Sequence, residues 1–164
     1  GCGGGDLLVP KRRVFITRAT YTGNLGGLLG GDNICTNAAA GAGLSGKFFA
    51  WLSDGQLNAL ERASEGAAWY AVAADSAPPF HARGGLVAQP EFPIRTDEYG
   101  ARLAGARYWT GAHIGGNPGD ACDGWTNDTD ARRGLVGDGG TDYTWTEVAV
   151  DPCAAHHAVL CFQQ

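Results

Sequence analysis

The chain has 164 residues, a length typical of one domain that can bury its own hydrophobic core. Only 18% of the residues are charged and the formal net charge is −5, which argues against nucleic acid and anionic membranes as partners, because both require a basic face. Glycine is abundant at 27 residues, methionine is absent, and five tryptophans and five tyrosines are present, a composition more typical of a loop-rich fold with aromatic anchors than of a helical bundle.

At the amino-terminal end, residues 1–12 are predicted to form a flexible, glycine-rich tether ahead of a single domain over residues 13–164. The opening letters GCGGGD resemble the end of a bacterial lipoprotein signal, in which a cysteine receives the lipid. Gly1 precedes that cysteine, so three alternatives stay open for Cys2: a lipid anchor, a disulfide to another chain, or an inert tail. Apolar stretches in the chain are strand-sized, and we predict no membrane-spanning segment.

The first structured elements are a strand and a helix. Residues 12–23, RRVFITRATYTG, are rich in β-branched and aromatic side chains and predict the strand. A glycine-rich loop, GNLGGLLGGDN, is expected next. Asp32 or Asn33 can then cap a helix through ICTNAAAGAG, with Cys35 facing the core and Gly43 as its stop.

In the middle of the chain, KFFAWLSD predicts a strand, QLNALERASEG a second helix, and AWYAVAAD another strand. From Ser76 to Gly105 four prolines interrupt any regular pattern, so we expect a long loop excursion there.

Strand character returns in the carboxyl-terminal part of the chain, in ARYWTGAHI, TDYTWTEVAV and HAVLCFQQ. This order of elements favours an α+β fold, with two helices packed on a twisted antiparallel sheet, over alternating βα units. Because both ends of the domain are strands, they can pair with each other in the sheet.

Four cysteines remain after Cys2 and permit three disulfide connectivities. A terminal strand beside an early helix would bring Cys161 to Cys35 and tie the two ends of the domain together. Cys122 and Cys153 would then close the loop region between two late strands. Such bridges belong in an oxidising compartment, so we expect an extracellular or cell-surface protein.

These cysteines, with Trp109 ahead of CDGW, YTWTE before Cys153 and a final AVLCF, resemble the C-type-lectin-like fold. The pattern is most similar to the endostatin-like branch and to an uncharacterised family of bacterial secreted proteins and lipoproteins. The stretches VFITRATYTGNLGG and GLSGKFFAWLSD match that family's pattern too, so the resemblance covers roughly Arg13 to Phe162. It implies the fold, two nested disulfides and a bacterial origin, but no single function, because the fold hosts sugar-binding, protein-binding and structural roles.

Lectins of this fold often bind calcium, and this chain departs from their sugar-binding pattern. The long loop reads Gln89-Pro90-Glu91 where that pattern has Glu-Pro-Asn or Gln-Pro-Asp, and the late strand reads Trp145-Thr146-Glu147 in place of Trp-Asn-Asp. A separate set of acids is the calcium candidate: Asp120, Asp123, Asp128, Asp130 and Glu147. Turn formation by Asp and Asn explains the same residues and is the favoured interpretation.

The aromatic residues supply the candidate ligand contacts. All five tryptophans lie in or beside expected strands, where core packing is the default. Trp125 and Tyr143, in the region rich in glycine and aspartate, are the best candidates to reach the surface and stack on a ligand, with Asn127 nearby.

Three further motifs fail on context. GAGLSGK, at residues 41–47, matches GxGxxG, but a helix rather than a strand precedes it and no helix follows. The group Cys153, His156, His157 and Cys161 lacks the spacing of a zinc site. No nucleophile, base and oxyanion donors can be assembled for an enzyme.

We therefore predict a non-enzymatic binding or adhesion module that recognises a protein or carbohydrate ligand through its loop-rich face, without a cofactor other than the calcium candidate. The alternative is a structural subunit of an extracellular assembly, in which copies associate through the amino-terminal arm or Cys2.

Overall fold

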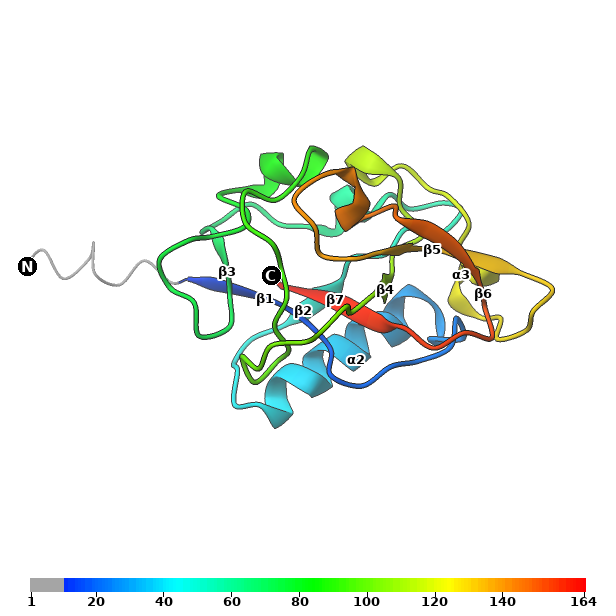
Figure 1. Cartoon of the computed structure of the whole chain (residues 1–164), viewed down its shortest axis with the longest axis horizontal. Helices are drawn as coiled ribbons and strands as arrows, with labels where there is room; N and C mark the ends of the chain where they lie inside the picture. The colour runs from blue at the N-terminus through cyan, green and yellow to red at the C-terminus, as the bar shows by residue number, and fades with distance from the viewer. Residues whose placement is uncertain (1–10) are drawn as a thin grey trace, which may run out of the picture.

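The computed structural model describes residues 11–164, so Cys2 and most of the predicted tether lie outside the described residues. Within that range the protein has an α+β architecture built on a seven-stranded sheet (Figure 1). The strands are β1 (Arg12–Ile16), β2 (Phe48–Ala50), β3 (Trp69–Ala71), β4 (Tyr108–Trp109), β5 (Arg133–Gly137), β6 (Ala149–Pro152) and β7 (Ala158–Gln163). The helices are α2 (Gly27–Gly41) and the single turn α3 (Cys122–Trp125), with 3₁₀ turns η1 (Ala59–Arg62), η2 (Arg83–Val87), η3 (Ile114–Gly116) and η4 (Tyr143–Trp145).

The last strand, β7, lies at the centre of the sheet, whose order is β3-β1-β7-β4-β5-β6, with β2 also pairing with β7. Its sequence AVLCFQ is buried over the first five residues, which explains a continuous apolar run instead of an alternating one. Val14 of β1 faces Phe162 of β7, so the predicted pairing of the first and last strands is confirmed.

The sheet is mixed, which corrects the expectation of an antiparallel sheet. β1 pairs in parallel with β3, and β4 pairs in parallel with β7, while the other pairs are antiparallel. A parallel pair requires a long connection, and the segment between β1 and β3 contains α2, β2 and η1. Apolar runs in a sequence indicate strands but do not indicate their direction.

Helix α2 begins at Gly27, earlier than the predicted caps Asp32 and Asn33, so the expected glycine-rich loop is largely helical. Its glycines serve close packing: a Cβ on Gly31 would lie 2.6 Å from the Leu52 side chain. The helix packs on one face of the sheet, against β2 and β7, and buries Cys35 and Ala39 there (Figure 1).

The predicted second helix, QLNALERASEG, is wrong in extent. Only η1 forms in that stretch, because side chains take over the backbone groups that a helix would use. Ser53 Oγ accepts the Ala59 N–H and Asn58 Oδ1 accepts the Leu60 N–H, and the backbone turns extended at Ala63. The second helix of the fold is instead α3.

Two late elements also differ from expectation. The predicted strand TDYTWTEVAV splits into η4 and β6, because Asp142 accepts the Thr144 N–H and caps a turn. The predicted strand ARYWTGAHI contributes only β4. Strand β5, RGLVG, has no counterpart among the predicted elements, since a glycine-rich run of five residues lacks a strand signal.

All five tryptophan side chains are fully buried, and each indole N–H holds a segment outside its own strand or turn. The acceptors are Thr146 Oγ1 for Trp51, Gln163 O for Trp69, Tyr21 O for Trp109, Ser53 O for Trp125 and Ala88 O for Trp145. Buried indoles generally find such a partner, so these residues anchor loops as well as filling the core.

Both predicted disulfides are present. Cys35 of α2 bonds to Cys161 of β7 across a sequence separation of 126 residues, and Cys122 bonds to Cys153 across 31 residues. In the part of the chain that the structure describes, no helix is both long enough and apolar enough to cross a membrane.

Candidate functional site

Trp125, predicted to reach the surface, is fully buried, and that prediction is wrong. Its ring packs 5.8 Å from the Trp109 ring and its N–H donates to Ser53 O at 2.9 Å. It lies in α3, a turn in which Cys122, Asp123 and Trp125 all have positive φ, and this left-handed backbone directs the indole inward. No face of the ring is left for a ligand.

Tyr143 and Asn127 do not form one site with each other. Tyr143, in η4, is exposed, as predicted. Asn127 is half-buried, and its amide bonds to Asp123 Oδ2 and to Thr129 within its own loop. The two residues belong to opposite ends of β5, because α3 lies beside Gly134 and η4 lies beside Gly137.

The acids of the predicted calcium cluster do not converge. Over residues 11–164, no group of three or more His, Cys, Asp or Glu side chains is placed to hold a metal ion. Asp123 pairs with Arg132 and Glu147 pairs with His113, while Asp120, Asp128 and Asp130 are exposed. The predicted calcium site is therefore wrong. These acidic residues are instead explained as turn formers, some with local ion-pair partners.

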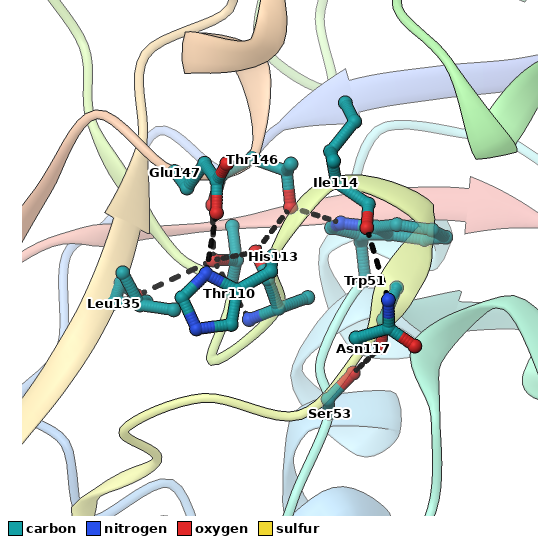
Figure 2. Close-up of polar contacts among 11 residues, drawn as sticks. Trp51, Ser53, Thr110, His113, Ile114, Asn117, Leu135, Thr146 and Glu147 are labelled. Carbon is teal, nitrogen blue, oxygen red and sulfur yellow. Dashed lines mark hydrogen bonds and ion pairs between the residues drawn. The ribbon is translucent and has the colours of Figure 1, made fainter.

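The hydroxyl groups around the His113–Glu147 ion pair hold loops in place (Figure 2). Beneath it the Thr110 hydroxyl donates to Thr146 O at 2.6 Å, and the Thr146 hydroxyl donates to Ala112 O at 2.8 Å. The nearby Ser53 hydroxyl donates to Gly116 O. Because these hydroxyls are committed to backbone carbonyls, the arrangement fixes the loops around η3 and does not supply an activated nucleophile beside the histidine.

A different region has the shape of a ligand site. Two neighbouring hollows flank the segment Leu103–Arg107, one of about 470 Å³ and one of about 350 Å³. We call them the arginine hollow and the histidine hollow. Besides the shared segment, the arginine hollow is lined by Ile16, Ile94, Arg95, Arg102 and Asp138. The histidine hollow is lined by Thr17, Arg18, Thr20, His156, His157 and Ala158.

The two hollows are positioned by a short antiparallel hairpin within the proline-rich excursion, whose first arm lies beside the end of β1. Ile16 N–H donates to Thr96 O at 3.0 Å, and Leu103 N–H donates to Arg95 O at 2.8 Å. Asp97 closes the turn between these two arms by accepting the N–H groups of Tyr99 and Ala101. Here the proline-rich excursion meets the rigid sheet, an arrangement in which loops commonly carry recognition.

Positive charge concentrates in the lining, although the whole chain is acidic. Four arginines line the hollows, Arg18, Arg95, Arg102 and Arg107, against one carboxylate, Asp138. The last three arginines are exposed, and their guanidinium groups form no hydrogen bond or ion pair with any described residue. The hollows can therefore attract and bind an anionic group.

Arg18 is held differently from the other arginines. Its Nε donates to Asp97 Oδ2 at 2.7 Å, and its guanidinium lies 4.4 Å from the centre of the Tyr99 ring. Burial alone would raise the pKa of Asp97, but the hydrogen bonds from Arg18 and from the Ala101 and Tyr99 N–H groups outweigh it and leave this pKa below its usual value. Asp97 is therefore a charged buried group that supports the site.

His157, which lies just before β7, has a hydrogen-bond partner nearby in the chain. His157 bonds to Asp151 at 2.6 Å, and its ring meets Trp109 edge-on at 4.8 Å. On the sequence, His156 and His157 were rejected as zinc ligands. The structure places both in the lining of the histidine hollow.

Neither hollow was predicted from the sequence. Three of the four arginines lie within Arg95–Arg107 but form no recognisable motif, and Arg18 lies beside this stretch because Ile16 N–H donates to Thr96 O. The one usable signal was the excess of arginine over acidic residues in the stretch Arg95–Arg107. In comparisons with known proteins, no family model matches this chain, and no curated protein matches it either.

Proposed function

We propose that this chain is an extracellular or surface-tethered binding and adhesion module of bacterial origin, which recognises a protein or glycan ligand through its loop-rich face. The α+β architecture with two disulfides is compatible with the C-type-lectin-like fold of the endostatin-like kind that the cysteine and tryptophan pattern resembles. Two disulfides fit an oxidising, extracellular environment.

The observation that carries the proposal is the pair of hollows flanking Leu103–Arg107. Exposed arginines without partners among the described residues remain solvated until a ligand arrives, and they then supply charge-assisted hydrogen bonds. A binding role also agrees with the commitment of the Thr110, Thr146 and Ser53 hydroxyls to backbone carbonyls.

The test is binding of the full chain to an array of immobilised glycans and extracellular proteins, compared with an Ala104→Trp variant. Ala104 is exposed and lines both hollows, so a bulky ring there should fill them without changing the charge. Ala40→Trp, on the exposed side of α2, is the matched control. We expect the wild type and the control to bind the same ligands and Ala104→Trp to lose them.

Equal binding by Ala104→Trp would move the site away from the hollows and contradict the proposal. Absence of any binding, together with oligomers that dissociate on reduction or in a Cys2→Ser variant, would support the alternative role as a structural subunit of an extracellular assembly.

A further inference from the structure

The arginine hollow has the size and floor of a small-molecule site. Its volume of about 470 Å³ lies within the range of about 300–1,000 Å³ that such sites occupy. Its apolar floor is formed by the half-buried Leu103 and Ala106, which pack against the core cluster that contains the buried Ile16 and Ile94. A fixed apolar floor of this kind suits the carbon face of a ring.

Three arginines from one short stretch of chain line this small volume. Arg95 and Arg102 lie on the two arms of the excursion, and Arg107 follows before β4. A guanidinium can bind a carboxylate through two parallel hydrogen bonds, a geometry that lysine does not offer. An anionic group in the hollow would also relieve the repulsion among the three like charges.

Asp138 restricts which anion fits. Its Oδ1 accepts the Gly140 N–H at 3.0 Å and shares the Thr144 hydroxyl with Asp142, while its Oδ2 has no partner among the described residues. That free oxygen can accept hydrogen bonds from ligand hydroxyls, and its charge repels a second anionic group. The lining therefore disfavours an extended polyanion and favours one negative charge beside several donors.

We infer that the arginine hollow recognises an acidic sugar, a single ring with one carboxylate and several hydroxyl groups. The carboxylate binds the arginines, the hydroxyls donate to Asp138, and the carbon face of the ring covers the floor of Leu103 and Ala106. This inference rests on the proposed binding function and deepens it.

The test titrates the full chain with four probes by calorimetry and by NMR: glucuronate, glucose, acetate and inorganic sulfate. Glucuronate and glucose differ in the carboxylate, acetate carries that group without the ring, and sulfate reports simple anion binding. We expect glucuronate to bind and the other three to bind at least about tenfold more weakly. Glucose lacks the charge-assisted pair with the arginines, acetate lacks the ring and the hydroxyls that contact the floor and Asp138, and sulfate lacks both and is repelled by Asp138.

Two variants assign the binding to the proposed groups. Arg102→Gln should weaken glucuronate binding by about tenfold or more, whereas Arg133→Gln, an equal change in charge at an exposed arginine outside the lining, should not. Asp138→Asn should weaken glucuronate and strengthen sulfate, because it removes both the acceptor for hydroxyls and the repulsion of anions. A merely structural role for Asp138 would weaken both probes.

Several results would overturn the inference and leave the proposed function standing. In the first, glucose, sulfate or acetate binds as tightly as glucuronate. In the second, Arg102→Gln behaves like Arg133→Gln. In both, the chain still binds ligands on the array. If the full chain binds nothing on the array, the proposed function and this inference both fail.

Discussion

At the scale of single residues, Asp97 links the stability of the protein to the shape of the candidate site. It is fully buried, and its two oxygens accept the Tyr99 and Ala101 N–H groups on one side and the Arg18 guanidinium on the other. The turn that it closes separates Arg95 from Arg102. Loss of this carboxylate should therefore loosen the wall of the arginine hollow.

Asp97→Asn should lower the free energy of unfolding by about 2 kcal/mol at pH 7, the range expected for hydrogen bonds to a charged group. The folded state holds the pKa of Asp97 below its usual value, so the ionised carboxylate stabilises the native protein. That contribution is complete above the unfolded pKa of about 3.9 and is lost as the pH falls through the lower folded pKa. The difference between wild type and variant should be constant from about pH 5 to pH 8 and shrink below about pH 4.

Urea denaturation at pH 7 and at pH 3 measures this difference. Asp128→Asn is the control, because Asp128 is exposed and its side chain makes no hydrogen bond with the described residues. We expect no change in stability for the control at either pH. A difference for Asp97→Asn that grows at pH 3 would contradict the argument.

The roles of the cysteines could be predicted from the sequence, and the role of Trp125 could not. The sequence placed Cys35 in the core and gave both disulfide pairs correctly, because a cysteine has few alternatives once the strands are located. It failed for Trp125, since the left-handed turn that buries this ring depends on contacts with Ser53 and Trp109, far away in the chain. The exposure of an aromatic side chain is decided by tertiary contacts that local sequence does not contain.

At the scale of elements, strands with dense apolar character were predictable and short elements were not. The starts of β1, β2 and β7 follow from apolar runs of β-branched and aromatic residues. The glycine-rich start of α2 was read as a loop, although its small residues allow the helix to approach Leu52 closely. Glycine thus served packing at a position where local propensity indicates flexibility.

Asp32, predicted to cap α2, instead joins that helix to the edge of β2. Its carboxylate accepts the Ala50 N–H at 2.9 Å and pairs with Arg62, while Arg62 donates to Ala50 O. These two side chains satisfy both backbone groups of Ala50 on the side of β2 where no further strand pairs with it in residues 11–164. The Arg62 side chain is only 8% exposed, so it depends on its carboxylate partner.

Asp32→Ala should therefore destabilise the protein by about 3 kcal/mol, the lower part of the range for breaking a buried ion pair. Asp32→Asn should cost less, because it keeps an acceptor for Ala50. Arg132→Ala is the matched control: it breaks the Arg132–Asp123 pair, in which both side chains are about half exposed, and should cost under about 1 kcal/mol. Guanidinium denaturation measures all three, and equal losses for Asp32→Ala and Arg132→Ala would contradict the assigned role.

At the scale of the whole molecule, the closure of the sheet by its two chain ends was predictable and the candidate site was not. Pairing of β1 with β7 follows from strands at both ends and from a cysteine in the last one. The hollows combine the end of β1, the excursion, the loop after β5 and the turn before β7. Their assembly depends on mixed strand directions, which the sequence pattern does not indicate.

The two disulfides should stabilise this closure unequally. In the chain-entropy model, the Cys35–Cys161 bridge is worth about 5 kcal/mol for its separation of 126 residues, and the Cys122–Cys153 bridge about 3.5 kcal/mol for 31 residues. The shorter bridge also holds α3, where Cys122, Asp123 and Trp125 adopt a left-handed backbone that costs roughly 1–2 kcal/mol per non-glycine residue. Its removal releases part of that strain.

Denaturation of the double variants Cys35→Ala/Cys161→Ala and Cys122→Ala/Cys153→Ala should therefore show losses of about 5 kcal/mol for the first and less than about 3.5 kcal/mol for the second. The first bridge also fixes β7 against α2, and β7 contributes Ala158 to the histidine hollow, so its loss should weaken ligand binding in a chain that still folds. A larger loss for the second variant would mean that removing its bridge does not release the strain of α3. The stability of the sheet would then depend more on the region around β5 and β6 than on the pairing of β1 with β7.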